Sequence, residues 1–137
     1  MGVPSAQGLD MTDPMGKPMV LVVEDEPLIV DLVADTLREG GFNVTAASDG
    51  VQAQAALMSG LVFQGLVTDI HLPGPISGWE VARMARTQFP QIAIVYATGH
   101  GELDWSAEGV PGSVLLSKPF APSQALVALS QQLSVTG

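Results

Sequence analysis

Four short apolar runs in this chain each end in polar residues that can bind a metal ion or a phosphoryl group. The runs and their polar ends are residues 19–23 with Glu24 and Asp25, residues 66–67 with Thr68 and Asp69, residues 92–97 with Thr98, and residues 114–116 with Ser117 and Lys118. If these runs are parallel strands of one sheet, every polar end lies at the carboxyl edge, where open α/β sheets bind ligands. The pattern predicts that three acids, a hydroxyl and a lysine share one crevice.

The three acids in this set indicate a metal site. Carboxylates at adjacent strand ends raise one another's pKa unless a cation lies among them, so Glu24, Asp25 and Asp69 require a positive partner. Ligands that are all oxygen favour a hard ion, and Mg²⁺ typically takes one or two carboxylates, several waters and phosphate oxygens. We therefore expect Mg²⁺. Taken singly, Asp25 or Asp69 could equally be a strand-end acid that caps the next helix.

Thr98 and Lys118 supply the other half of a phosphoryl-transfer site. A hydroxyl can donate a hydrogen bond to a phosphoryl oxygen, and an ammonium group can neutralise the charge that develops there. Asp69 is the candidate nucleophile, because a carboxylate can form an acyl phosphate when the phosphorus is held in line.

The elements that must position these residues alternate regularly along the chain. Strands are predicted at residues 19–23, 42–46, 66–68, 92–97 and 114–116. Helices are predicted from Pro27 to the glycines at 40 and 41, over residues 50–58, from the cap Ser77 to Phe89, and over residues 123–133. Residues 99–112 contain four glycines and a proline, so a helix there should be short. Because right-handed crossovers return each helix over the sheet, the pattern predicts an α/β fold: a five-stranded, doubly wound parallel sheet between two helical layers.

Composition narrows the classes of function. The chain has 137 residues, 47% of them hydrophobic, which is enough for one folded domain. Its formal net charge of -9 would repel a phosphate backbone or an anionic membrane, so we expect no nucleic-acid and no membrane partner. The apolar runs are too short to span a bilayer, and the N-terminal residues lack the cationic start and apolar middle of a secretory signal. We therefore expect a cytoplasmic location. We expect residues 1–18 to be a flexible extension, residues 19–134 the domain, and residues 135–137 a tail.

Four motifs together resemble a known family. VLVVEDE, LVTDIHLPG, IVYATGH and SKPF, in this order, resemble the CheY-like receiver domain of bacterial two-component response regulators over about residues 19–134. The resemblance implies a flavodoxin-like fold with strand order 2-1-3-4-5. It also implies transfer of a phosphoryl group to Asp69 from a histidine kinase or a histidine phosphotransfer protein.

The same resemblance implies a role for each site residue. Magnesium would be held by Asp25, Asp69 and the main-chain carbonyl of His71, with Glu24 acting through water. Thr98 matches the family's switch hydroxyl and Lys118 its invariant lysine, and the peptide bond between Lys118 and Pro119 is cis in relatives.

The sequence also departs from the family's pattern. The loop HLPGPIS after Asp69 is one residue longer than in the simplest members, as in receivers of hybrid kinases and alphaproteobacterial regulators, and the interval from Thr98 to Lys118 is shorter. Leu115 stands where many relatives have an aromatic residue that swings inward on phosphorylation. We therefore expect intact chemistry but an altered surface around Leu115 and the preceding stretch.

Four other residues have competing interpretations. His71 and His100 follow strand ends and lie in loops. This position favours side chains that line the mouth of the site over side chains that bind a metal. We hypothesise that His71 influences the attack of water on the acyl phosphate. Trp79 is predicted to pack in the core. Trp105 either packs or anchors a partner protein.

The motifs favour a phosphorylatable signalling switch, not an enzyme, whose output passes to a downstream protein through altered contacts, as a monomer or a phosphorylation-dependent homodimer. The alternative from another class is a Mg²⁺-dependent phosphohydrolase with Asp69 as nucleophile. Against it, no second acid stands two residues after Asp69 to act as general acid, and no cap insertion is present. A nucleotide-binding module is disfavoured because neither G-x-G-x-x-G after the first strand nor a P-loop occurs.

Overall fold

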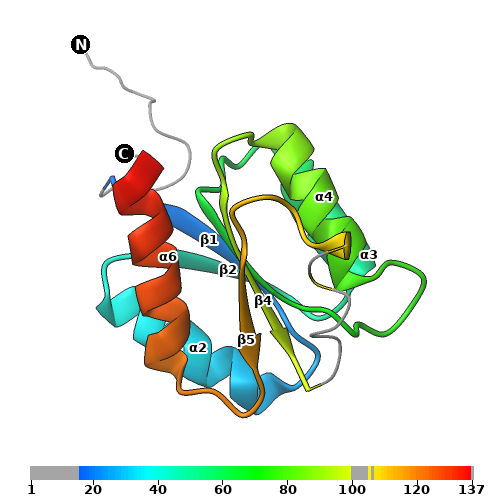
Figure 1. Ribbon diagram of the computed structural model, residues 1–137, viewed down its shortest axis with the longest axis horizontal. Helices are drawn as coiled ribbons and strands as arrows, with labels where there is room; N and C mark the ends of the chain where they lie inside the picture. The colour runs from blue at the N-terminus through cyan, green and yellow to red at the C-terminus, as the bar shows by residue number, and fades with distance from the viewer. Residues whose placement is uncertain (1–15, 100–104, 106, 137) are drawn as a thin grey trace.

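The computed structural model describes residues 16–99, 105 and 107–136, and it contains a five-stranded, all-parallel sheet (Figure 1). The strands are β1 (Met19–Val23), β2 (Asn43–Ala47), β3 (Gly65–Asp69), β4 (Ala93–Thr98) and β5 (Val114–Ser117). Their spatial order is β2-β1-β3-β4-β5. The predicted fold class and strand order are confirmed.

Helices cover both faces of this sheet. They are α2 (Pro27–Glu39), α3 (Gly50–Leu57), α4 (Gly78–Gln88) and α6 (Pro122–Thr136). Helices α2 and α6 lie on one face, and α3 and α4 lie on the other (Figure 1). Within the described residues, no helix combines the length and apolar character needed to cross a bilayer.

The core consists of two apolar layers, one on each face of the sheet. In β1, Leu21 and Val23 pack in the layer beneath α3 and α4, while Val20 and Val22 pack in the layer beneath α2 and α6. All four side chains are at most 1% exposed. Burial on both faces is why the central strands β1, β3 and β4 appear in the sequence as apolar runs and not as alternating patterns.

Strand ends differ from the predicted bounds in a way that matters for the site. Asp69, Thr98 and Ser117 are the last residues of their strands and not the first residues of the following loops. The parallel pairing continues through them, with Asp69 opposite Ala97 and Thr98 opposite Ser117. The sheet itself therefore holds the backbone of these residues.

The predicted cap of α4 is confirmed. The Ser77 hydroxyl accepts a hydrogen bond from the backbone N–H of Glu80 at 3.2 Å, and the Glu80 carboxylate accepts one from the backbone N–H of Ser77 at 2.9 Å. This reciprocal capping box pairs two N–H groups that the first helical turn cannot pair by itself. It fixes where α4 begins, directly after the loop that follows Asp69.

The stretch after β4 has little regular structure where it is described. Trp105, Ala107 and Glu108 are helical, and the N–H of Gly109 donates to the carbonyl of Trp105 at 2.8 Å. The Trp105 indole N–H donates to Ser113 Oγ at 3.0 Å, and its ring packs against the core. Trp105 is therefore a packing residue here, whereas His100 lies outside the described residues.

Candidate functional site

Sheet register brings the polar strand ends together. Strands β1, β3, β4 and β5 are consecutive neighbours in the sheet, and Val23 pairs with Thr68, one residue before Glu24 and Asp69. Thr98 pairs with Ser117, one residue before Lys118. All four endings thus meet at the carboxyl edge, as the sequence predicted.

Lys118 is the centre of the hydrogen-bonded cluster at this edge. Its Nζ donates to Glu24 Oε1 at 2.9 Å and to Asp69 Oδ2 at 3.0 Å, and it lies 3.8 Å from Glu26 Oε1. The side chains of Glu24 and Asp69 are 5% and 8% exposed, and that of Lys118 is 21% exposed. A single ammonium group therefore bridges two nearly buried carboxylates from different strands.

The other oxygens of these two carboxylates bind main-chain N–H groups. Glu24 Oε2 accepts from the N–H of Glu26 at 3.2 Å, and Asp69 Oδ1 accepts from the N–H of His71 at 3.1 Å. Both carboxylates are thus oriented from two sides, which fixes their rotamers before any ligand binds.

The electrostatics of the cluster follow from this geometry. Burial raises the pKa of Glu24, and the charge of Asp69 raises it further, although the hydrogen bond from Lys118 opposes this. Burial alone would lower the pKa of Lys118, but its hydrogen bonds to Glu24 and Asp69 and their charges outweigh this and raise it. Lys118 therefore carries a firmly held positive charge beside the candidate nucleophile.

Asp25 completes a group of acids that could hold a metal ion. It is exposed, and one oxygen each from Glu24, Asp25 and Asp69 lies within 4.8 Å of the others. Two oxygens bound to one Mg²⁺ lie at most about 4.2 Å apart, because each sits about 2.1 Å from the ion. The donor set is all oxygen and close to that spacing, so these residues fit a hard divalent ion.

Thr98 is fully buried at the end of β4, next to β3. Its carbonyl accepts the backbone N–H of Lys118 at 2.8 Å, and the carbonyl of the preceding Ala97 accepts the N–H of Ile70 at 3.1 Å. These bonds tie the last two residues of β4 to both neighbouring strand ends. The Lys118-Pro119 peptide bond is cis, as expected from the resemblance.

Sequence reasoning did not include Gly78, which shapes the loop after Asp69. Its N–H donates to the Ile70 carbonyl at 2.9 Å, and a Cβ at this position would overlap the main-chain carbonyl of Asp69. Only glycine lets the start of α4 approach the end of β3 so closely. The signal in the sequence was a glycine directly after a helix-capping serine.

Tyr96 and Glu26 were also not among the predicted residues. Tyr96 is fully buried in β4, with its ring centroid 4.8 Å from that of Trp79, so the predicted packing role of Trp79 is confirmed. Glu26 is the third acid of the run EDE and the most exposed carboxylate near Lys118. Two features of the sequence could have drawn attention to them: a tyrosine within an otherwise aliphatic strand, and a third consecutive acid.

Together these side chains provide a nucleophilic carboxylate, a fixed positive charge, a buried hydroxyl-bearing residue and a cluster of acids for a cation, all at one sheet edge. This is the set of groups that phosphoryl transfer to a carboxylate requires.

The chain is similar to several known proteins. The family model described as the response regulator receiver domain matches residues 20–130. A solved structure of a response regulator receiver protein from Sinorhizobium medicae is 41% identical, covers 90% of this chain and 99% of its own, and superposes with a TM-score of 0.86. The chemotaxis response regulator CheY4 of Vibrio cholerae is 27% identical with a TM-score of 0.72, covering 85% of this chain and 98% of its own.

Curated relatives are longer proteins. The probable transcriptional regulatory protein TcrX of Mycobacterium tuberculosis is 32% identical over 89% of this chain, and PetR of Rhodobacter capsulatus is 34% identical over 82%. The chain spans about half the length of each, 53% and 47%. The family match covers most of the chain and agrees with the fold and the site described above, so the chain belongs to the response regulator receiver domain family of two-component systems.

Proposed function

We propose that this chain is a phosphorylatable switch in which Asp69 accepts a phosphoryl group from a phosphohistidine of a histidine kinase or phosphotransfer protein. The observation that carries the proposal is the position of Lys118, whose Nζ contacts both Asp69 and Glu24 at hydrogen-bonding distance. Asp69 is only 7% exposed, and desolvating a carboxylate in this way costs free energy, which the ion pair with the partly buried Lys118 offsets.

In the proposed reaction, a carboxylate oxygen of Asp69 attacks the phosphorus while the bond between phosphorus and the imidazole nitrogen breaks. The departing imidazole takes the electron pair of that bond. Lys118 then transfers one of its hydrogen bonds to the phosphoryl group and neutralises its charge, and the hydroxyl of Thr98 donates to another phosphoryl oxygen. Bound Mg²⁺ would offset further phosphoryl charge, with Glu24, Asp25, Asp69 and the His71 carbonyl as the proposed ligand set.

The signal would arise from the new charge at Asp69. A phosphoryl group adds about 1.5 to 2 negative charges, and drawing in Thr98 would shift the end of β4 and the stretch that follows it. A change of this kind alters which partner protein the surface binds. We propose that residues 19–134 carry this function as one unit, as a monomer or as a homodimer formed on phosphorylation.

The proposed partners are a histidine kinase or phosphotransfer protein and a downstream protein. The expectation of no nucleic-acid partner is not supported by the comparisons, because TcrX is named as a probable transcriptional regulatory protein. The chain covers only about half of that relative.

One experiment tests the function and separates it from the phosphohydrolase alternative. The protein is incubated with acetyl phosphate and Mg²⁺, and its intact mass is measured for the wild type, Asp69→Asn and the exposed control Asp35→Asn. One phosphoryl group should be added to the wild type and the control, none to Asp69→Asn, and none when a chelator removes Mg²⁺. Rapid multiple turnover of p-nitrophenyl phosphate without a stable adduct would contradict the switch and favour the hydrolase.

A further inference from the structure

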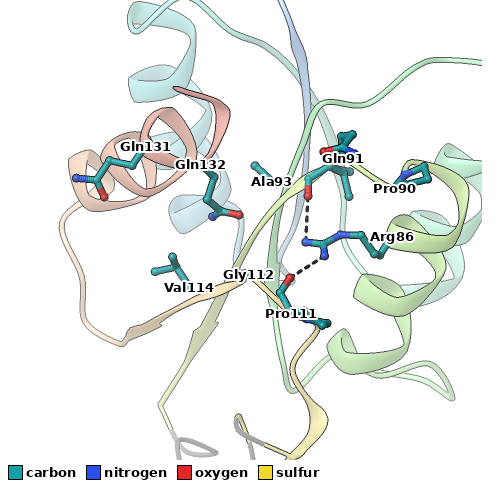
Figure 2. Close-up of a pocket in the computed structure, with 10 residues that line it drawn as sticks. Arg86, Pro90, Gln91, Ala93, Pro111, Gly112, Val114, Gln131 and Gln132 are labelled. Atoms are coloured by element: carbon teal, nitrogen blue, oxygen red, sulfur yellow. Dashed lines mark hydrogen bonds between the residues drawn. The ribbon is translucent and has the colours of Figure 1, made fainter. Parts of the chain in front are cut away.

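Arg86 on α4 donates hydrogen bonds to main-chain carbonyls, whereas Arg38, Arg83 and Lys118 form ion pairs with carboxylates. Its Nη1 donates to the Pro111 carbonyl at 2.7 Å and its Nη2 to the Ile92 carbonyl at 3.1 Å (Figure 2). Its Nε is buried, and no described residue accepts a hydrogen bond from it. Because a guanidinium has five N–H donors, these contacts leave donors without a protein acceptor.

The charge of Arg86 is also uncompensated within the described residues. Arg38, Arg83 and Lys118 each have a carboxylate within 4.0 Å, whereas no described carboxylate lies that close to Arg86. In a chain of net charge -9, a cation without an acidic neighbour is unexpected. A carbonyl is a neutral acceptor, so the two contacts of Arg86 do not neutralise it.

This guanidinium lies in the wall of a cavity of about 380 Å³ at the amino-terminal edge of β4 and β5. The size falls in the range of about 300 to 1,000 Å³ typical of small-molecule sites. The walls are formed by the end of α4, the turn before β5 and the end of α6 (Figure 2). The lining residues include Arg86, Pro90, Gln91, Pro111, Val114 and Gln132. Pro90, Gln91 and Pro111 are exposed, so the mouth reaches solvent.

The chemistry of the walls specifies a ligand. The Gln132 amide is already engaged, since its Oε1 accepts the Ile94 N–H and its Nε2 donates to the Ile94 carbonyl, both at 3.0 Å. The prolines and Val114 present apolar surface. The walls also carry the exposed neutral amides of Gln91 and Gln131, so Arg86 is the one charged lining residue. A cation with spare donors beside apolar surface matches a carboxylate attached to a compact apolar group.

We propose that this cavity is a binding site for a small organic carboxylate, held through its anionic group by Arg86 and through its apolar part by Pro90, Pro111 and Val114. The site lies at the amino-terminal edge of the sheet, whereas Asp69 and Lys118 lie at the carboxyl edge. Binding here is therefore independent of the phosphoryl-transfer chemistry, and the two proposals can fail separately.

Benzoate and benzamide test the proposal, because they share a ring and differ in the charge that Arg86 recognises. Each is titrated into the full chain while backbone amide resonances are followed by NMR. Benzoate should bind saturably, at least about tenfold more tightly than benzamide, with the shifts centred on residues 86–93 and 111–114. Arg86→Gln should remove this preference, and Arg38→Gln, which removes an exposed arginine elsewhere, should leave it unchanged.

A second variant keeps the test valid if Arg86→Gln loosens the fold. Gln91 is an exposed wall residue, so Gln91→Glu places a negative charge at the cavity without altering the contacts of Arg86 to the main chain. It should weaken benzoate binding several-fold and leave benzamide binding unchanged. Equal binding of the two probes by the wild type, or a preference for benzoate that survives in folded Arg86→Gln, would overturn the proposal.

Discussion

The phenol oxygen of Tyr96 accepts a hydrogen bond from the backbone N–H of Val110 at 3.1 Å, and so joins β4 to the irregular stretch that leads into β5. Both residues are buried: Tyr96 is fully buried, and Val110 is 8% exposed. Tyr96 stands two residues before Thr98, on the same face of β4. Tyr96 pairs in the sheet with Leu115 of β5, so this phenol contact with Val110 lies beside the position where the sequence lacks an aromatic residue.

Tyr96→Phe should destabilise the protein by about 1 to 3 kcal/mol, because it leaves the buried Val110 N–H without an acceptor while the ring still packs. Urea denaturation measures the change. Thr87→Val is the matched control: it also removes a hydroxyl hydrogen bond, from Thr87 Oγ1 to the Arg83 carbonyl, but at an exposed position, and it should cost less than about 0.5 kcal/mol. Equal effects of the two variants would contradict a structural role for the Tyr96 phenol.

Gly78→Ala should impair both folding and phosphorylation, since the new Cβ would overlap the Asp69 carbonyl and push α4 away from the end of β3. We expect a loss of about 2 kcal/mol or more in unfolding free energy, together with slower acetyl phosphate labelling. Gly99→Ala is the control, because a Cβ built there has no heavy atom of the described residues within 4 Å apart from its chain neighbours. If Gly78→Ala is as stable as this control, the start of α4 has room for a Cβ beside the end of β3, which would contradict the prediction.

Lys118→Met should lower stability at neutral pH by about 3 kcal/mol, because it leaves two nearly buried carboxylates without their cation. The stability difference between the wild type and Lys118→Met should become smaller as pH rises. The folded-state pKa of Lys118 is raised above its usual 10.5, so its contribution is complete below pH 10.5 and is lost as pH rises through the folded value. Denaturation of both proteins from pH 8 to 12 should show the wild-type advantage shrinking only above pH 10.5. An advantage that grows with pH would contradict the ion-pair assignment.

Asp25→Asn should weaken magnesium binding by more than about tenfold, because it removes an exposed carboxylate from the three-acid group. Calorimetric titration with MgCl₂ measures this affinity. Asp31→Asn, an exposed acid on α2 outside the group, is the control and should bind Mg²⁺ as the wild type does. If both variants bind equally well, Asp25 is not a ligand.

His71→Ala should change the lifetime of phosphorylated Asp69 without preventing phosphorylation. The residue is exposed, and its main-chain N–H donates to Asp69 Oδ1, so the substitution leaves that hydrogen bond in place. Loss of the phosphoryl group is followed by intact mass after the donor is removed. An unchanged lifetime would end the hypothesis that the imidazole influences the attacking water.

The sequence by itself determined the fold and the edge at which the site lies. Strands buried on both faces must be apolar throughout, so β1, β3 and β4 were visible as runs, and the polar residue that ends each run marked the carboxyl edge. Ser77 likewise predicted the start of α4, because a helix cap is made by neighbours in the chain; the reciprocal bond from Glu80 was found in the structure.

Only the tertiary structure decided which atoms meet across that edge. That Lys118 bridges Glu24 and Asp69 depends on the register of strands far apart in sequence. The fit of Gly78 against Asp69, the bond from Val110 to Tyr96 and the cavity at Arg86 depend on how helices and loops pack over the sheet. Local patterns carry no record of such contacts, because each is made by residues that the chain separates and packing brings together.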